Sequence, residues 1–78
     1  MRPTVPSIYS ADYRRLLKEL VRARKAAQLT QVEVARRLGK PQSFVSKYER
    51  GERRLDVIEF LRVARAIDID AVALLARF

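Results

Sequence analysis

The chain has 78 residues, of which 49% are hydrophobic and 33% are charged, and it contains neither cysteine nor histidine. This is the composition of one small globular domain, and it excludes a disulfide framework, a zinc finger and any thiol or imidazole catalysis. No apolar run approaches the length of a membrane span, and the N-terminal segment lacks the apolar core of a signal peptide. We therefore expect a cytoplasmic protein.

The charge of the chain is strongly positive, with 17 basic and 9 acidic residues and a net charge of +8. Such a field attracts polyanions, nucleic acids above all, although a purely solubilising surface would give the same total. The distribution favours a nucleic acid, because seven basic residues against two acidic ones lie between Arg36 and Arg54.

The first ten residues differ from the rest of the chain. Residues 1–10 contain two of the three prolines and no helical period, so they predict a flexible N-terminal arm. Ser10 can cap a following helix, and the negative charge of Asp12 suits its first turn. Apolar residues at helical spacing extend this helix to about residue 27: Tyr13, Leu16, Leu17, Leu20 and Val21.

A short second helix is predicted over residues 31–38. Thr30 can cap it with its hydroxyl, and Glu33, three residues later, completes a capping box. Gly39 ends this helix, because glycine adopts the positive φ that a helix C-terminus often requires.

A third helix follows at once, over residues 42–50. The fixed φ of Pro41 suits the first turn of a helix, Val45 and Tyr48 supply apolar anchors, and Gly51 ends the helix. Two short helices joined by a tight turn that contains glycine form a helix-turn-helix unit.

The remainder of the chain predicts two further helices after a polar loop. Asp70 can cap the second of them, which is short. No alternating strand pattern occurs anywhere in the sequence, so we expect an all-α, compact five-helix bundle over residues 11–78. The residues that mark the fourth helix are Val57, Phe60, Leu61, Ala64 and Ile67.

Many positions between residues 12 and 76 follow one known pattern. Those positions are Leu29-Thr30-Gln31, Glu33-Val34-Ala35, Leu38-Gly39, Gln42-Ser43, Val45-Ser46 and Glu49-Arg50-Gly51, with Arg24 upstream and Leu61, Ala64, Ile67, Ile69, Asp70 and Leu74 downstream. With this spacing, the chain resembles the phage-repressor class of helix-turn-helix domains, the Cro and XRE type. The resemblance implies a lambda-repressor-like fold and a sequence-specific double-stranded DNA-binding transcriptional regulator, usually a repressor, of bacterial or phage origin and associated with the nucleoid.

Two positions depart from the family pattern. Gln28 stands where the family usually has a glycine that closes the first helix, so we expect a residue other than glycine at positive φ. Pro41 replaces the usual small polar residue before the helix predicted over residues 42–50 and removes one backbone N–H group.

The resemblance implies that the helix over residues 42–50 enters the major groove, where the N-terminal residues of such helices meet base edges. Glutamine can pair with adenine through two hydrogen bonds, and serine both donates and accepts. Phe44 has two interpretations, contact with a thymine methyl group or packing against the preceding helix. The candidates for base contact are Gln42, Ser43, Phe44, Ser46 and Lys47.

Other polar residues are candidates for contact with DNA phosphates. Gln31 opens a helix, whose N-terminus favours anions, and the resemblance implies that it holds a phosphate. Arg50, Arg53 and Arg54 follow the recognition helix, although each could instead be a solvated loop charge.

Arg24 and Glu49 fall on otherwise apolar stripes, where charges are rarely found unless they are paired. The resemblance suggests that they pair with each other and join the first helix to the recognition helix, a structural role. No nucleophile–base set, metal cluster or Gly-rich phosphate loop occurs, so we expect no catalysis, metal, cofactor or small-molecule ligand.

The C-terminal residues are rich in apolar side chains. Leu74 matches a core position of the family, which leaves Val72, Leu75 and Phe78 as candidates for a homodimer interface on a palindromic operator, unless they close the core of the monomer. An alternative function is a protein-interaction module, such as an antitoxin or adaptor. RNA is a less favoured partner, because the deep, narrow groove of an A-form duplex does not admit a helix.

Overall fold

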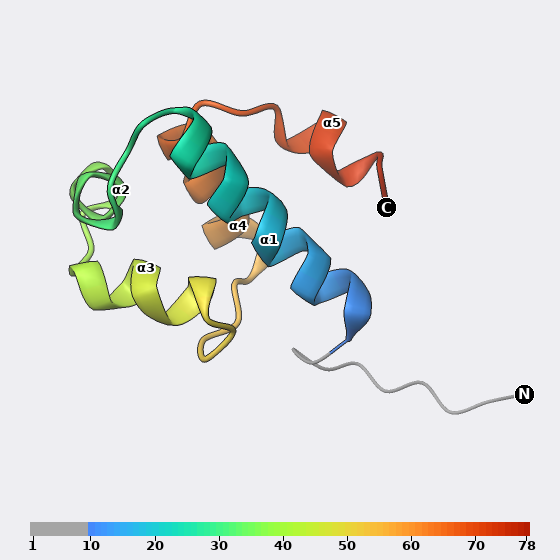
Figure 1. The fold of residues 1–78 in the computed structure, drawn as a ribbon, viewed down its shortest axis with the longest axis horizontal. Helices are drawn as coiled ribbons and strands as arrows, with labels where there is room; N and C mark the ends of the chain where they lie inside the picture. Colours follow the sequence, from blue (N-terminus) through green and yellow to red (C-terminus); the bar gives the residue numbers. More distant parts are fainter. Residues whose placement is uncertain (1–9) are drawn as a thin grey trace, which may run out of the picture.

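A computed structural model describes residues 10–78 of the protein, and this part of the chain is entirely helical apart from turns and loops (Figure 1). The predicted five-helix, all-α fold is therefore confirmed. Most of the N-terminal arm predicted over residues 1–10 lies outside the described residues. The five helices are α1 (Ala11–Ala26), α2 (Gln31–Leu38), α3 (Gln42–Glu49), α4 (Val57–Ala66) and α5 (Ala71–Leu75).

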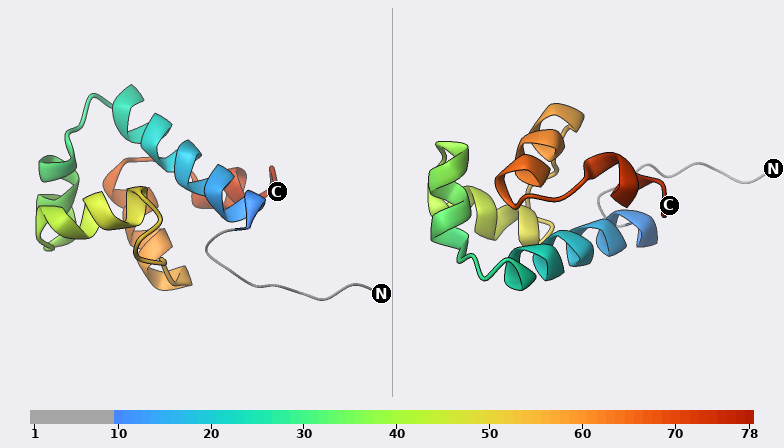
Figure 2. Two further views of the ribbon diagram at one scale, coloured as in Figure 1. Left: turned by 60° about the horizontal axis from the view of Figure 1, so that its bottom comes forward. Right: turned by 90° about the horizontal axis from the view of Figure 1, so that it is seen from above.

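The helices surround one core, and α2 packs against both α3 and α4 while α1 packs against α3 (Figure 2). The C-terminal segment after α5 returns to α1, where Arg15 Nη2 donates to the carbonyl oxygen of Arg77 at 2.7 Å. No helix in residues 10–78 is long and apolar enough to cross a membrane. The largest side chains that are almost completely inaccessible are Leu20, Val34, Val45, Tyr48, Val63 and Ile67.

Four of the five helices begin at a side-chain cap. The side chains of Ser10, Thr30, Asp56 and Asp70 each accept a hydrogen bond from the backbone N–H three residues later. The exception is α3, which follows Pro41 and has no side-chain cap. The caps predicted at Ser10, Thr30 and Asp70 are confirmed.

Four helices end in the same left-handed turn. Gln28, Gly39, Gly51 and Asp68 have φ values of 60°, 68°, 79° and 62°. In each turn, one backbone N–H bonds back three residues and the next bonds back five residues, which satisfies the last carbonyl groups of the helix. The positive φ predicted for Gln28 is thus confirmed. Asp68 adopts the same conformation, which aspartate tolerates better than most residues do.

The prediction of which residues of α4 face the core was partly wrong. Val57 is 72% exposed and Leu61 is 38% exposed. Val57 is the first residue of the helix and lies beyond the edge of the core, while Leu61 is rotated by about 100° from the buried Phe60. The buried face of α4 and its C-terminal turn consists instead of Phe60, Val63, Ala64, Ala66 and Ile67.

Candidate nucleic-acid interface

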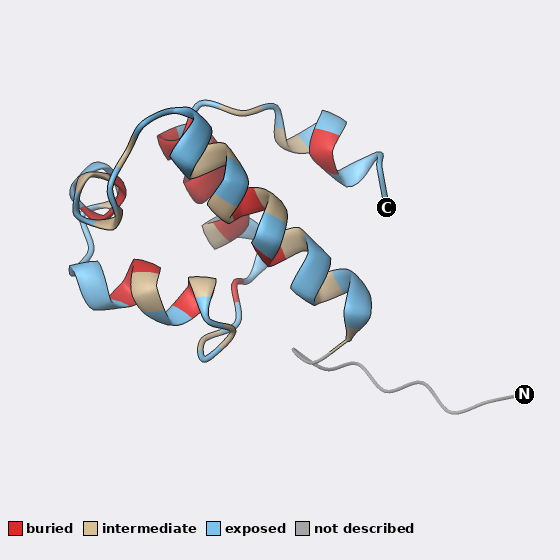
Figure 3. Ribbon diagram, viewed as in Figure 1, coloured by how far each residue is buried: buried red, intermediate tan, exposed pale blue. Residues whose placement is uncertain are grey.

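The recognition helix α3 has a clear division between buried and open residues, visible as alternating bands in Figure 3. Val45 and Tyr48 are at most 1% exposed and anchor the helix in the core. Gln42, Ser43 and Lys47 are exposed, and Ser46 is half-buried. Four of the five predicted base-contacting residues therefore lie on or beside one accessible face of α3.

The fifth candidate, Phe44, lies in the core and not on this accessible face, contrary to its assignment as a base contact. The residue is only 9% exposed, and its ring meets that of Tyr48 edge-to-face with the centroids 5.7 Å apart. Because burial of an aromatic ring is strongly favourable, the packing interpretation is the correct one of the two. The ring also lies beneath the guanidinium group of Arg53, 4.7 Å from its centroid.

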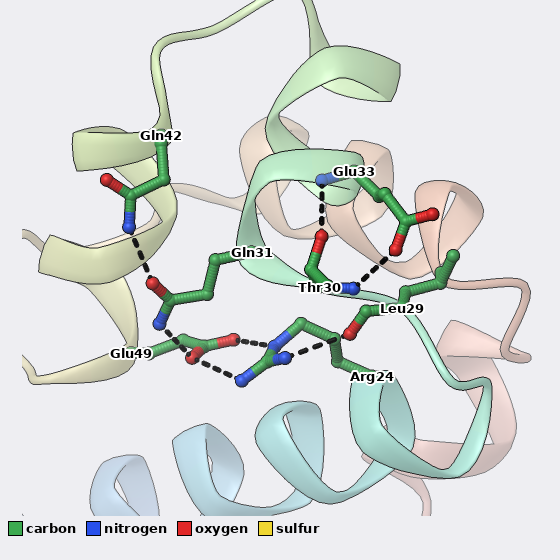
Figure 4. Close-up of polar contacts among 7 residues, drawn as sticks. All are labelled: Arg24, Leu29, Thr30, Gln31, Glu33, Gln42 and Glu49. Atoms are coloured by element: carbon green, nitrogen blue, oxygen red, sulfur yellow. Dashed lines mark hydrogen bonds and ion pairs between the residues drawn. The ribbon is translucent and has the colours of Figure 1, made fainter.

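An ion pair joins α1 to α3. Arg24 Nε donates to Glu49 Oε2 at 2.7 Å, and Arg24 Nη2 donates to Glu49 Oε1 at 3.2 Å (Figure 4). The side chains are only 11% and 6% exposed. Arg24 Nη1 also donates to the carbonyl oxygen of Leu29 at 2.9 Å, so the guanidinium group is fixed from two sides. Such a planar, two-point pair sets the position of α3 relative to α1.

The carboxylate of Glu49 also orients two glutamines on the accessible side of the helix-turn-helix unit. Gln31 Nε2 donates to Glu49 Oε1 at 2.8 Å, and Gln42 Nε2 donates to Gln31 Oε1 at 2.7 Å (Figure 4). An ionised carboxylate only accepts hydrogen bonds, so Gln31 must turn its amide nitrogen toward Glu49 and its oxygen toward Gln42. We call these four linked residues, Arg24, Glu49, Gln31 and Gln42, the buried-pair network.

The N-terminus of α2 is also fixed locally. Thr30 Oγ1 accepts from the N–H of Glu33 at 3.1 Å, and the Glu33 side chain accepts from the N–H of Thr30 at 2.8 Å. The hydrogen bond from the Thr30 backbone holds the pKa of Glu33 below its usual value. Gln31 is the first residue of this capped helix, so its backbone N–H is at the end of the helix that favours anions.

Arg50 is engaged with two neighbours on the surface. It pairs with Glu52, with Nε 2.9 Å from Oε2, and Arg50 Nη1 donates to Ser46 Oγ at 2.6 Å. The hydrogen bond from Arg50 lowers the pKa of Glu52. Both charged side chains are more than half exposed, so water screens this pair strongly.

Arg53 is held more tightly than its position in a loop suggests. Its two terminal nitrogens donate to the two carboxylate oxygens of Glu59 at 2.9 and 2.7 Å. These hydrogen bonds, with one from the backbone of Asp56, lower the pKa of Glu59 to about 2. The spacing of Asp56 and Glu59 matches a capping box. The sequence analysis did not use this signal, which marks the start of α4, and it did not predict that Glu59 binds Arg53.

Arg54 has the fewest polar contacts of the three predicted phosphate-contacting arginines. Its guanidinium carbon lies 4.6 Å from the centroid of the Tyr13 ring, and no ion pair within residues 10–78 involves it. The Tyr13 hydroxyl accepts from the backbone N–H of Leu55 at 3.0 Å, which fixes the ring. Arg54 is therefore placed by stacking, and its guanidinium donors have no acceptor among residues 10–78.

The residues predicted for a dimer interface are all accessible. Val72, Leu75 and Phe78 are 76%, 48% and 44% exposed, whereas Leu74 is 7% exposed and belongs to the core. The ring of Phe78 is partly covered by the guanidinium group of Arg15, 4.0 Å from its centroid. Residues 10–78 contain no cluster of side chains suited to a metal ion.

Comparison with known proteins agrees with this geometry. A family model described as helix-turn-helix matches residues 20–74. An XRE-family like protein from Pseudomonas syringae pv. tomato str. DC3000 is 57% identical, with a TM-score of 0.86 over 90% of this chain and 85% of that chain. The chain belongs to the XRE-type helix-turn-helix family. The family resemblance inferred from the sequence is thus confirmed.

Two further relatives of this XRE-type chain are a restriction-modification controller protein and an antitoxin. The restriction-modification controller protein C.AhdI from Aeromonas hydrophila is 32% identical, with a TM-score of 0.74 over 83% of this chain and 98% of that chain. Antitoxin HigA1 of Mycobacterium tuberculosis strain H37Rv is 44% identical over 57 residues, which are 73% of this chain. The matched part spans only 38% of the length of that antitoxin.

Proposed function

We propose that this protein is a sequence-specific double-stranded DNA-binding transcriptional regulator that inserts α3 into the major groove. The observation that carries the proposal is the buried-pair network, which ends in an exposed glutamine at the first position of α3. A helix-turn-helix domain presents this end of its second helix to base edges.

The contact between Gln31 and Gln42 prepares Gln42 for one base. It uses one of the two N–H bonds of the Gln42 amide, so the other N–H and the carbonyl oxygen remain for a ligand. A neighbouring donor and acceptor on one amide complement N7 and N6 of adenine. We therefore assign Gln42 to an adenine in each half-site, with Ser43, Ser46 and Lys47 as further contacts to bases.

The residues proposed for phosphate contact differ in how many of their hydrogen-bond donors already have a partner in the protein. Gln31 offers its backbone N–H at the start of α2, and Arg54 has open donors above the ring of Tyr13. Arg50 and Arg53 are each shared with a carboxylate, so a phosphate must compete with that carboxylate or use the remaining guanidinium edge. We assign the strongest of the arginine contacts to Arg54.

We further propose that two copies of the chain bind a palindromic operator and repress by occupying a promoter. The supporting observation is the exposure of Val72, Leu75 and Phe78 on one segment of the chain. A two-fold interface is self-complementary, so Leu75→Glu alters it twice. We expect this variant to sediment as a monomer and to keep only weak binding to a half-site, whereas a wild type that binds DNA as one copy per site would refute the dimer.

The proposal of DNA recognition is tested by selecting bound sequences from randomised duplex DNA at a stated salt concentration. We expect an inverted repeat with half-sites about one helical turn apart. The affinity should fall with rising salt, with a slope of about −0.9 in log K per neutralised phosphate. No enrichment of any sequence, together with an affinity that is flat across salt concentrations, would contradict the proposal.

A second candidate function is that of an antitoxin, which would bind a protein partner in addition to DNA. The similarity to antitoxin HigA1 favours it, although the match covers 73% of this chain and 38% of that protein. The test is co-expression with the gene product encoded next to this chain. Growth arrest by that product alone, relieved by this chain, would support the antitoxin function, and the absence of any toxicity would contradict it.

A further inference from the structure

A cleft lies where the C-terminal turn of α2 meets the C-terminal half of α4. It has a volume of about 570 Å³ and is lined by Arg37, Leu38, Arg62, Arg65 and Ala66. Arg37 Nη1 donates to the carbonyl oxygen of Ala66 at 2.8 Å, which fixes Arg37 at the edge of the cleft. None of the residues assigned to DNA contact lines it.

The three arginines of this cleft have no carboxylate partner. The ion pairs within residues 10–78 involve other arginines, and none includes Arg37, Arg62 or Arg65. Three guanidinium groups around one cleft repel each other and leave many hydrogen-bond donors open. The cleft is therefore electrostatically complementary to a ligand that carries several negative charges.

An apolar surface continues from the arginines. A second cleft of about 240 Å³ shares Leu38 and Arg62 with the first and adds Lys40, Phe44 and Ile58. Its two carboxylates, Asp56 and Glu59, already cap α4, and Glu59 also binds Arg53. We call the two connected clefts the α2–α4 groove.

The outer face of α4 has the same division into apolar and basic parts. Ile58, Leu61, Arg62 and Arg65 follow the spacing i, i+3, i+4 and i+7 and thus share one face of the helix. Ile58 is 58% exposed and Leu61 is 38% exposed. The N-terminal half of this face is apolar and its C-terminal half is basic.

The arginine end of the groove lies apart from the proposed base contacts, whereas its apolar end reaches Phe44 and Glu59, which contact Arg53. Arg37 follows Gln31 by six residues on α2, so its side chain leaves the helix about 240° further round and about 9 Å further along the axis. At that end of α2 its partner is the C-terminus of α4. None of the proposed contacts of Gln31 and Gln42 with DNA uses Arg37, Arg62 or Arg65.

We propose that the α2–α4 groove binds an acidic, amphipathic segment of a partner protein. Carboxylates of the segment pair with Arg37, Arg62 and Arg65, since guanidinium groups bind carboxylates through two parallel hydrogen bonds. Apolar side chains of the same segment cover Leu38, Ile58 and Leu61. A nucleic-acid backbone would use the arginines but would leave this apolar surface open to water, so the mixed surface favours a protein segment.

The test uses a short fluorescent peptide that forms an amphipathic helix, with glutamates on one face and leucines on the other, and a matched peptide with glutamine in place of glutamate. We expect the acidic peptide to bind and to shift the amide resonances of α4 and the end of α2. Arg62→Gln with Arg65→Gln should weaken its binding at least tenfold. The control variant, Arg14→Gln with Lys18→Gln on α1, removes the same charge and should change binding by less than about threefold, as expected for a distant surface site.

Binding of duplex DNA to the same variants separates this proposal from DNA recognition. We expect Arg62→Gln with Arg65→Gln to leave the salt slope of duplex binding unchanged. A slope reduced by about 0.9 per arginine would show that they hold phosphates, and it would overturn the proposal. The proposal would also be overturned by a peptide that does not bind or that shifts the resonances of α1 and α3 instead. Equal binding of the peptide to the Arg62/Arg65 variant and to the control variant would overturn it as well. Unaltered amide spectra outside the groove verify that each variant is folded.

Discussion

Two sets of charged residues flank the recognition helix, and they differ in burial. The buried-pair network lies between α1, α2 and α3, with the side chains of Arg24 and Glu49 only 11% and 6% exposed. The loop after α3 carries the pairs Arg50–Glu52 and Arg53–Glu59, in which the arginines are 57% and 41% exposed. The same ion-pair chemistry therefore occurs in two settings, between helices in the interior and at the surface beside α3.

The difference follows from the cost of desolvation. A buried charge that loses its partner keeps its desolvation cost, whereas an exposed charge recovers its hydration. The network thus holds Gln42 through a hydrogen bond from its amide to Gln31. Under the proposed function, Arg50 would exchange its carboxylate for a phosphate at lower cost than Arg53, whose pair with Glu59 is less exposed.

The largest expected effect comes from breaking the buried pair. Glu49→Ala leaves Arg24 without its carboxylate and removes the acceptor that orients Gln31. We expect a loss of roughly 3–5 kcal/mol in the free energy of unfolding, a large part of the stability of so small a domain. Thermal melting measures it, with Glu52→Ala as the exposed control that should melt near the wild type. Wild-type melting of both Arg24→Ala and Glu49→Ala would contradict the interior role.

The next effect concerns the end of the network. Gln42→Ala should lower affinity for the selected operator by ~1–3 kcal/mol and relax the choice of base at one position of each half-site. Binding titrations on the operator and on a random duplex measure both. Because Gln42 lies at the surface, the melting temperature should hardly change. An equal loss of affinity on both duplexes would remove Gln42 from base recognition.

The loop arginines should show smaller effects that do not depend on DNA sequence. Arg54→Ala should weaken binding to every duplex alike and reduce the salt slope by about 0.9, because one phosphate contact is lost. Arg53→Ala should do the same and also lower the melting temperature, since Arg53 covers Phe44 and binds Glu59. A loss confined to the selected operator would show that these arginines contact bases instead.

The smallest effect should appear in the pH dependence of stability. The pKa of Glu59 is lowered from its ordinary value of 4.5 to about 2 by Arg53 and the cap of α4. Because the pKa of Glu59 is lower in the folded state, its ionised carboxylate stabilises the fold at pH values above the ordinary pKa. This contribution is lost as the pH falls from about 4.5 to about 2. The difference in melting temperature between wild type and Glu59→Gln should therefore shrink over that range. A constant difference would show that the carboxylate charge of Glu59 does not contribute.

Some features of this protein follow from short stretches of sequence alone. Thr30 with Glu33, and Gly39, specify where helices begin and end, because a cap or a left-handed turn depends on residues within about one helical turn. The positive φ of Gln28 was expected only from the family resemblance. The spacing of Val45 and Tyr48 was enough to orient α3 toward the core. These local signals gave the five helices, the helix-turn-helix unit and its open face.

Other features depend on contacts between distant parts of the chain. The burial of Phe44, the exposure of Val57 and Leu61, and the link between Gln31 and Gln42 all depend on how the helices pack against each other. The sequence places Arg53 in a polar loop, but only the path of this loop between α3 and α4 in the folded chain brings it onto Phe44 and Glu59. Helical periodicity defines a face to within a residue or two, and the neighbouring helices decide which residues at its border are covered.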